Sequence, residues 1–216
     1  MYTPRMGERD RWTATGPVSL CWGRDMTHRS KCTNSWDELV RFWEETDWPE
    51  GCKVEIVDGV VTVAPLVSVR HGSITSEVTR SLCNVVPEDW YVFHRQATVV
   101  PSRRGLYIPD VVVFPKPAGR GSDYFVPAAA AELAVEITSE FNAHQDRISK
   151  AAGYAEAGVP LYLLIDGWDP GGPTVTLYGE PKGDVYRVLQ AVKFGEEITL
   201  PDPFNLTIDT STFPVS

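Results

Sequence analysis

Two apolar runs joined by one amphipathic segment constrain the fold of this chain most strongly. Residues 132–138 and 161–166 are dense in aliphatic side chains, which is typical of central strands covered on both faces. The segment between them, 145–158, repeats apolar residues at helical spacing and is predicted to turn Ile148, Ala152 and Ala155 inward. A strand, a helix and a strand in this order predict a parallel pair with a crossover helix, and hence an α/β fold.

Two further helices are predicted in the amino-terminal half. Ser35 and Glu38 have the spacing of a capping box, which starts a helix that ends at the turn 48–51. A second helix is predicted over 70–86, where apolar residues recur at every third or fourth position.

The remaining apolar runs predict strands. Asp58-Gly59 is the dipeptide of a tight type I′ turn, so the runs on either side of it predict a hairpin. A second hairpin is predicted near the carboxyl terminus, followed by a last strand through Ile198 and Leu200. The predicted strands are 53–57, 60–64, 91–100, 106–114, 174–178 and 185–192.

Length and charge narrow the class of protein. The 216 residues can bury a sizeable core and predict one domain over 33–216. Residues 1–32 have no sustained periodicity and are predicted to be a flexible leader. The formal net charge of −9 argues against general nucleic-acid affinity through the overall field.

One segment departs from this acidic balance. From 95 to 120 the only acid is Asp110, and it stands among Arg95, Arg103, Arg104, Lys116 and Arg120. These cations are predicted to surround a site at Asp110, although such a run is also typical of a solvated loop.

Cysteine spacing and hydropathy argue against zinc-binding, disulfide-rich and membrane proteins. Cys21, Cys32, Cys52 and Cys83 form no C-x-x-C pair, so neither a zinc site nor a disulfide framework is predicted. The amino terminus lacks a long apolar segment, and no stretch approaches the roughly 20 residues of a membrane-spanning helix. The sequence therefore predicts a cytoplasmic protein without membrane insertion.

Asp110 and Glu136 are lone carboxylates in or beside apolar strand patterns. Asp110 precedes a run of three valines and a phenylalanine, and Glu136 lies within Ala-Val-Glu-Ile. Burying an unpaired charge is costly, and carboxylate oxygens are preferred ligands of hard divalent cations. The pattern predicts a divalent cation between two strands, with Lys150 on the following helix near the carboxyl ends of the sheet.

Each candidate also has a simpler explanation. Asp110 follows a proline and could cap a turn. Lys150 could be solvated, or could be only the i,i+4 partner of Asp146. His71 could simply begin a helix, and Tyr154 could pack on the sheet.

An ordered set of residues between about 35 and 210 resembles the Uma2 group of restriction-endonuclease-like proteins, in the PD-(D/E)xK nuclease superfamily. The set comprises Glu55, His71, Pro109-Asp110, Glu136 to Ser139, Asp146, Lys150, Tyr154, residues 158–162 and Asp166. The resemblance implies a mixed central sheet flanked by helices, to which the carboxyl-terminal hairpin would be added. It also implies that Asp110 and Glu136 are metal ligands.

The chain departs from the superfamily pattern at one position. Thr138 stands two residues after Glu136, where the superfamily usually has lysine. The resemblance implies that Lys150 replaces it. Its ammonium would orient the attacking water or stabilise charge in the transition state.

Phosphodiester hydrolysis explains why such ligands would be needed. In-line attack requires an activated water, neutralised nonbridging oxygens and a stabilised leaving oxygen, and one or two Mg²⁺ or Mn²⁺ ions supply all three. The carbonyl of Ile137 could complete the coordination sphere. Glu55 and His71 could add a ligand or hold a water, and Tyr154 could hydrogen-bond into the site.

The sequence therefore predicts a divalent-metal-dependent endonuclease acting on DNA. Two alternatives stay open. The fold could have lost turnover and serve as a nucleic-acid or protein-binding module, with a homodimer through the carboxyl-terminal hairpin. It could also hydrolyse small phosphodiesters, which fits the acidic surface.

Overall fold

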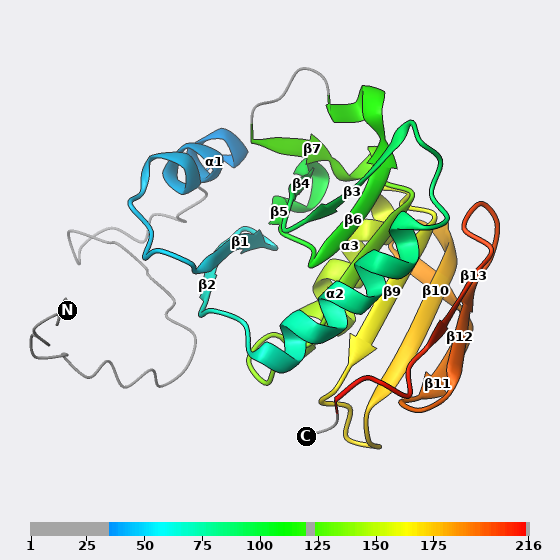
Figure 1. Ribbon diagram of the computed structural model, residues 1–216. Helices are drawn as coiled ribbons and strands as arrows, with labels where there is room; N and C mark the ends of the chain where they lie inside the picture. The colour runs from blue at the N-terminus through cyan, green and yellow to red at the C-terminus, as the bar shows by residue number, and fades with distance from the viewer. Residues whose placement is uncertain (1–34, 120–123, 215–216) are drawn as a thin grey trace, which may run out of the picture.

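The computed structural model describes residues 35–119 and 124–214. The predicted leader, Cys21 and Cys32 lie outside these residues, whereas Cys52 and Cys83 are free thiols. The described strands form three sheets, and helices cover both faces of the largest one (Figure 1). No helix in this part of the chain is long and apolar enough to cross a membrane.

A six-stranded mixed sheet forms the centre of the molecule. Its strand order is β11 (Val185–Lys193), β10 (Thr174–Lys182), β9 (Leu161–Asp166), β8 (Leu133–Ile137), β6 (Val111–Pro115) and β3 (Trp90–His94). β8 and β9 are parallel and the other neighbours are antiparallel. The predicted crossover between these two strands is confirmed, and it runs through a π-helical segment, η4 (Gln145–Lys150), and α3 (Ala151–Glu156).

Alternating side chains of this sheet pack against different helices. On one face, α2 (Val69–Cys83) buries Ile74, Val78 and Leu82 against the sheet. On the other face, Tyr154 of α3 packs with Tyr162 of β9. Both faces of the central strands are thus covered, as their continuous apolar pattern predicts.

A five-stranded sheet lies beside the central one. Its order is β2 (Val60–Ala64), β1 (Lys53–Val57), β5 (Gly105–Tyr107), β4 (Ala97–Val100) and β7 (Phe125–Pro127). The predicted hairpin of β1 and β2 is confirmed, because Asp58 and Gly59 both have the positive φ of a type I′ turn.

The first helix, α1 (Trp36–Glu45), packs Leu39 against this five-stranded sheet. Its predicted capping box is confirmed: the Glu38 amide donates to the Ser35 hydroxyl, and the Ser35 amide donates to the Glu38 carboxylate. Short 3₁₀ turns complete the connections at η1 (Pro101–Arg103), η2 (Lys116–Gly119) and η3 (Ala128–Ala130).

Two predicted strands are wrong in the same way. The segments 91–100 and 106–114 are each broken and divided between the two large sheets, as β3 and β4, and as β5 and β6. The first break falls at Arg95, which has a positive φ, and the second at Pro109, which cannot donate a ladder hydrogen bond. Asp110 consequently lies where the two sheets meet.

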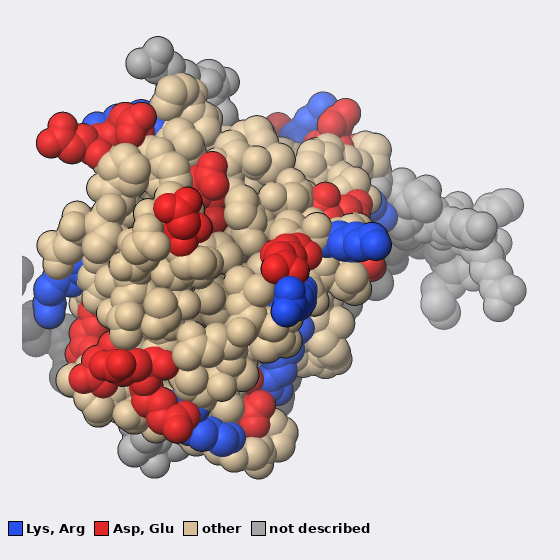
Figure 2. Space-filling view, turned by 90° about the vertical axis from the view of Figure 1, so that its right-hand side faces the viewer, with Lys and Arg blue, Asp and Glu red and all other residues tan. Residues whose placement is uncertain are grey.

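The carboxyl-terminal elements complete the fold. The predicted hairpin is confirmed as β10 and β11, and a small sheet of β12 (Glu197–Leu200) and β13 (Leu206–Asp209) packs on the α2 side of the core. Figure 2 shows the molecule from the side where β11, β12 and β13 lie in Figure 1, and on this face Lys and Arg are scattered among Asp and Glu and form no continuous basic patch of described residues. Val185 and Val188 of β11 are exposed, and a homodimer through this hairpin stays a prediction.

Candidate active site

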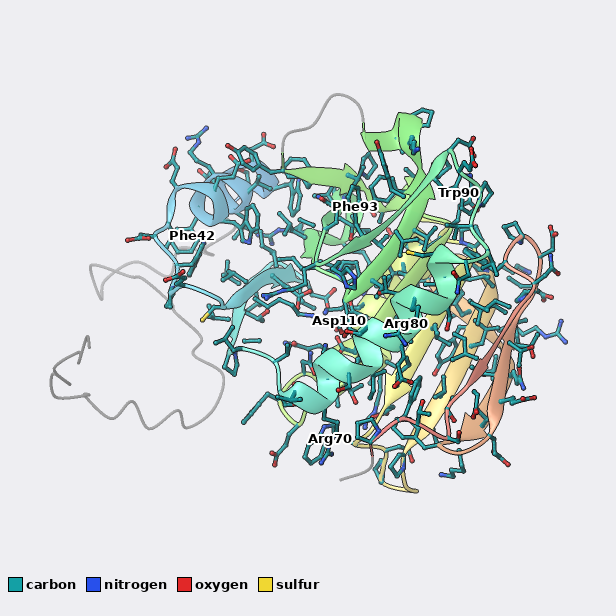
Figure 3. All side chains as sticks on the ribbon, viewed as in Figure 1. Phe42, Arg70, Arg80, Trp90, Phe93 and Asp110 are labelled. Atoms are coloured by element: carbon teal, nitrogen blue, oxygen red, sulfur yellow. The ribbon has the colours of Figure 1, made fainter. Side chains whose placement is uncertain are left out.

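Four carboxylates and two lysines meet in the interior, where the five-stranded and six-stranded sheets adjoin. Asp110 lies at the centre of Figure 3, close to α2. None of the six side chains is more than 4% exposed. The group, here called the carboxylate cluster, comprises Lys53 and Glu55 of β1, Asp110 before β6, Glu136 of β8, and Asp146 and Lys150 of η4.

Lys150 lies at the back of this cluster and is fully buried. Its Nζ is 2.8 Å from Oε1 of Glu55, 3.1 Å from Oε1 of Glu136 and 3.0 Å from Oδ1 of Asp146. The Tyr154 hydroxyl donates to the same Glu136 oxygen at 3.0 Å. The lysine therefore faces the carboxylates, and its i,i+4 pair with Asp146 is a buried pair.

Lys53 is the residue that the sequence prediction missed. Its Nζ is 3.4 Å from Oε2 of Glu136, 3.8 Å from Oδ1 of Asp110 and 3.7 Å from Oε2 of Glu55. It also donates to the carbonyl of Ile108 at 3.1 Å. The sequence contained the information needed to predict this role. Residues two apart in a strand share a face, so a strand over 53–57 places Lys53 beside Glu55.

Asp110 is held by two donors. Nε2 of His71 lies 2.9 Å from Oδ1, and the Ile137 amide donates to Oδ2 at 2.8 Å. Glu55 is held in turn by the Ile108 amide, which donates to Oε1 at 2.7 Å. The structure therefore brings together all the predicted site residues.

The four carboxylates share only two ammonium groups, so the pKa values of two carboxylates are raised and those of the other two are lowered. Burial raises the pKa of Glu136 to about 8 and also raises the pKa of Asp146, because their lysine contacts do not offset it. Burial acts the same way on Asp110 and Glu55, but attraction to lysine outweighs it and lowers both pKa values. Burial opposes the charge of Lys150, yet its three acidic neighbours hold its pKa well above the usual value.

This donor set fits a divalent cation. Oxygens of Asp110 and Glu136 already converge on one cation, the Lys53 ammonium, and the Ile137 peptide adjoins Asp110. Among the described residues no three His, Cys, Asp or Glu side chains are arranged to hold a metal together. Mg²⁺ is commonly held by one or two carboxylates, with waters and substrate phosphates completing its sphere. A divalent ion would also attract the carboxylate form of Glu136, whose pKa burial raises.

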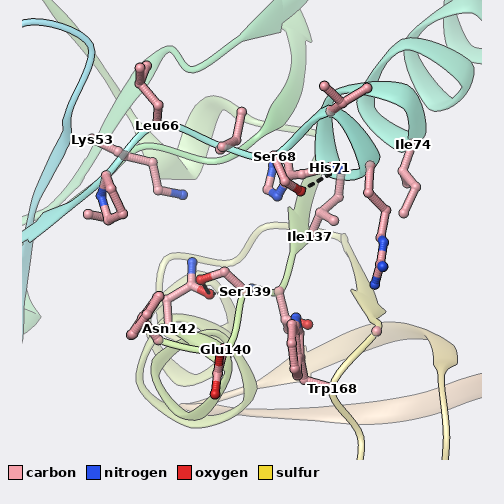
Figure 4. A pocket seen from close by; sticks show the side chains of 18 of the residues that line it. Lys53, Leu66, Ser68, His71, Ile74, Ile137, Ser139, Glu140, Asn142 and Trp168 are labelled. Carbon is pink, nitrogen blue, oxygen red and sulfur yellow. Dashed lines mark hydrogen bonds between the residues drawn. The ribbon is translucent and has the colours of Figure 1, made fainter. Parts of the chain in front are cut away.

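A cavity of about 570 Å³ opens beside the cluster. Lys53, His71 and Ile137 line it, so residues that touch the carboxylates form part of its wall (Figure 4). The segment before α2 forms one side and the segment after β8, with Trp168, forms the other. The four carboxylates of the cluster and Lys150 lie behind this wall and are not among the lining residues.

Two predictions about neighbouring side chains are wrong. Arg103 of the basic run pairs with Asp58, Glu156 and Asp184, and Lys116 lies over the ring of Tyr91, so neither cation contacts the carboxylate cluster. Arg120 lies outside the described residues. Ile148 is 58% exposed, although it was predicted to face inward. The helix 145–156 instead turns its charged residues Asp146 and Lys150 inward, because the cluster beneath it compensates them.

The mixed sheet, its flanking helices and the buried carboxylates with lysine define a protein of the restriction-endonuclease-like α/β class. The family Uma2, described as "Putative restriction endonuclease", matches residues 39–211. The chain belongs to the Uma2 family.

Solved structures with a similar fold include that of a protein from the genus Anabaena. The crystal structure of a "putative nuclease belonging to DUF820" from Anabaena variabilis superposes with a TM-score of 0.63, at 19% identity. The match covers 83% of this chain and 97% of that chain, so the two share nearly the whole fold. No curated protein matches the chain.

Proposed function

We propose that the protein is a divalent-metal-dependent endonuclease that hydrolyses phosphodiester bonds in DNA. The observation that carries the proposal is the convergence of Asp110 and Glu136 on a single cation beside an open cavity. The family description supports a nuclease in general terms. The substrate and the metal dependence are inferred from the chemistry of the site.

Asp110, Glu136 and the carbonyl of Ile137 would hold Mg²⁺ or Mn²⁺. The bound ion would polarise the phosphate and increase the acidity of water. His71 orients Asp110 through the contact at its Oδ1. Tyr154 fixes one oxygen of Glu136, so that the other is directed toward Lys53.

The two lysines have different roles in this proposal. Lys53 lines the cavity, so its ammonium is placed to stabilise negative charge that develops on a phosphate there. Lys150 has no exposed surface and contacts three carboxylates. It is therefore a positioning residue that holds Glu55 and Glu136 in place, although the sequence prediction assigned it to the reacting groups.

Plasmid cleavage tests the proposal. Purified wild type is incubated with supercoiled plasmid, linear duplex and single-stranded DNA in Mg²⁺ or Mn²⁺, with EDTA as the metal-free control. Asp110→Asn removes one ligand charge, and Asp89→Asn makes the same change at an exposed position. We expect metal-dependent cleavage by wild type and Asp89→Asn, and none by Asp110→Asn. Absence of cleavage by the folded wild type under all conditions would overturn the proposal in favour of a binding module.

A further inference from the structure

We propose that the cavity beside the carboxylate cluster binds an unpaired nucleotide, so that the substrate is single-stranded DNA or an unpaired region of a duplex. The inference rests on the proposed function, because it takes the ligand of the site to be DNA. It assigns the substrate class from the walls of the cavity, most of whose residues lie outside the carboxylate cluster and its proposed metal ligands.

Large apolar side chains stand exposed around the cavity. Leu66 and Val69 lie on one side, and they are 70% and 89% exposed. Phe141 and Trp168 lie on the other, and they are 71% and 43% exposed. Exposed apolar side chains that gather around a concave site are typical of ligand-binding surfaces.

The backbone that carries Trp168 is fixed by hydrogen bonds. The Trp168 amide donates to Oδ1 of Asp166 at 3.0 Å, and Nη2 of Arg147 donates to the Trp168 carbonyl at 2.8 Å. Arg147 also pairs with Asp166, with Nε 2.6 Å from Oδ2. Asp166 is buried and receives a further hydrogen bond from Thr138. The ring of Trp168 is thus held at the cavity on a rigid support while its surface stays open to solvent.

A tight turn carries Phe141 on the same side of the cavity as Trp168. Oδ1 of Asn142 accepts hydrogen bonds from the Ser139 amide at 2.6 Å and from the Ser139 hydroxyl at 2.8 Å. Two aromatic rings on fixed backbone offer planar surfaces for base stacking, which is the main source of affinity for single strands.

The charges that line the cavity suit a phosphate. Lys53 and Arg70 are its cationic side chains, and Glu140 is the one acid among its described lining residues. This local balance is opposite to the net charge of −9 for the chain. An anionic ligand with planar apolar groups therefore fits the cavity better than it fits the surface as a whole.

A paired duplex fits this arrangement poorly. Its bases stack on one another, so their faces are not available to Trp168 or Phe141. Duplex affinity without base stacking depends on cationic contacts with many phosphates. Two cations of the basic run are engaged elsewhere, because Arg103 pairs with acids and Lys116 lies over the ring of Tyr91. An unpaired nucleotide, by contrast, can place its base against the rings and its phosphate toward Lys53.

Fluorescence anisotropy tests the inference. The probe is a labelled oligonucleotide of mixed sequence, either single-stranded or annealed to its complement, in EDTA and again in Ca²⁺. Wild type is compared with Trp168→Ala and Trp168→Phe. Phe42→Ala is the matched control, because Phe42 is 42% exposed but lies on α1 and does not line the cavity. Thermal unfolding of each variant checks that the fold is retained.

We expect wild type and Phe42→Ala to bind the single strand more tightly than the duplex. Trp168→Ala should weaken single-strand binding about ten-fold, and Trp168→Phe should retain most of the affinity. Equal or tighter binding of the duplex, no binding of either form, or an unchanged affinity in Trp168→Ala would overturn the inference.

The outcome is separable from that of the proposed function. Metal-dependent plasmid cleavage, together with duplex binding as tight as single-strand binding, would overturn this inference and keep the nuclease. Trp168-dependent binding of the single strand without any cleavage would overturn the nuclease and keep the nucleotide site.

Discussion

Nζ of Lys53 lies 3.4 Å from Oε2 of Glu136, although 83 residues separate the two in the chain. The contact joins β1 of the five-stranded sheet to β8 of the six-stranded sheet. It places a cation between the carboxylates and the cavity, while Lys150 contacts Glu136 through the other oxygen.

Lys53→Met is expected to lower the rate of metal-dependent DNA cleavage by about 10²–10³-fold, since it removes a donor aimed at developing charge. Nicking rates at saturating DNA measure the effect. Lys182→Met removes a lysine at an exposed position of β10 and should leave the rate unchanged. A Lys53→Met protein that is folded and as active as wild type would exclude Lys53 from the proposed mechanism.

The central strands and their crossover were predictable from sequence, because continuous apolar runs and helical spacing report burial directly. The same patterns predicted that Asp110 and Glu136 lie in or beside apolar strands. The two sheets were not predictable, since the breaks at Arg95 and Pro109 depend on which sheet each half-strand joins. Local pattern does not encode that choice.

The inward face of the helix 145–156 could not be read from its apolar residues. Apolar spacing predicts Ile148 inside, but the structure buries Asp146 and Lys150 instead. Charged side chains of this helix are buried only because Glu55 and Glu136, distant in sequence, compensate them. At functional sites, charged side chains can be buried where apolar ones are expected. The pattern of one helix does not show which distant residues compensate these charges.

Lys150→Met is expected to destabilise the fold more than Lys53→Met. The change leaves Glu55, Glu136 and Asp146 without the ammonium that each contacts within 3.1 Å. Removing one partner of a buried ion pair typically costs about 3–5 kcal/mol. Urea unfolding of the two variants in EDTA gives the comparison. A stability equal to that of wild type would show that these carboxylates do not depend on Lys150.

Glu136→Gln is expected to remove a pH dependence of stability. Burial raises the pKa of Glu136 from 4.5 to about 8 in the fold, so the folded state binds one more proton than the unfolded chain between these values. The contribution of protonated Glu136 to the stability of the fold is fully present below pH 4.5 and is lost as the pH rises through about 8. Wild type in EDTA should therefore lose stability across this interval relative to the variant.

Urea unfolding of both proteins across that pH interval makes the comparison. The variant should also lose metal-dependent cleavage, because an amide is a weaker ligand than a carboxylate. Parallel stability curves for the two proteins would contradict the raised pKa.

Asp166→Asn is expected to destabilise the loop that carries Trp168. The Asp166 carboxylate accepts from Thr138, from the Trp168 amide and from the guanidinium of Arg147. Hydrogen bonds to a charged group contribute about 1.5–3 kcal/mol each, and the amide replaces only part of this acceptor set. Hydrogen exchange at the Trp168 amide should accelerate more than exchange in α1. Uniform exchange rates in the two proteins would exclude Asp166 as the anchor.

Gly153→Ala and Gly72→Ala are expected to change stability in opposite directions, although both glycines are helical. A Cβ on Gly153 would lie 2.6 Å from Cε2 and 2.9 Å from Cζ of Tyr107, a fully buried ring. Such overpacking typically costs about 1–3 kcal/mol. A Cβ on Gly72 meets nothing within 4 Å, so alanine should stabilise α2 by about 0.5–1 kcal/mol. Urea unfolding measures both.

The Gly153 substitution should also lower activity. Gly153 lies in α3, three residues after Lys150, and a helix displaced by the new methyl group moves that ammonium relative to Glu55 and Glu136. Gly72→Ala adds its methyl group in open space and should leave cleavage unchanged. Destabilisation by both substitutions would show that backbone geometry, and not the contact with Tyr107, sets the requirement for glycine.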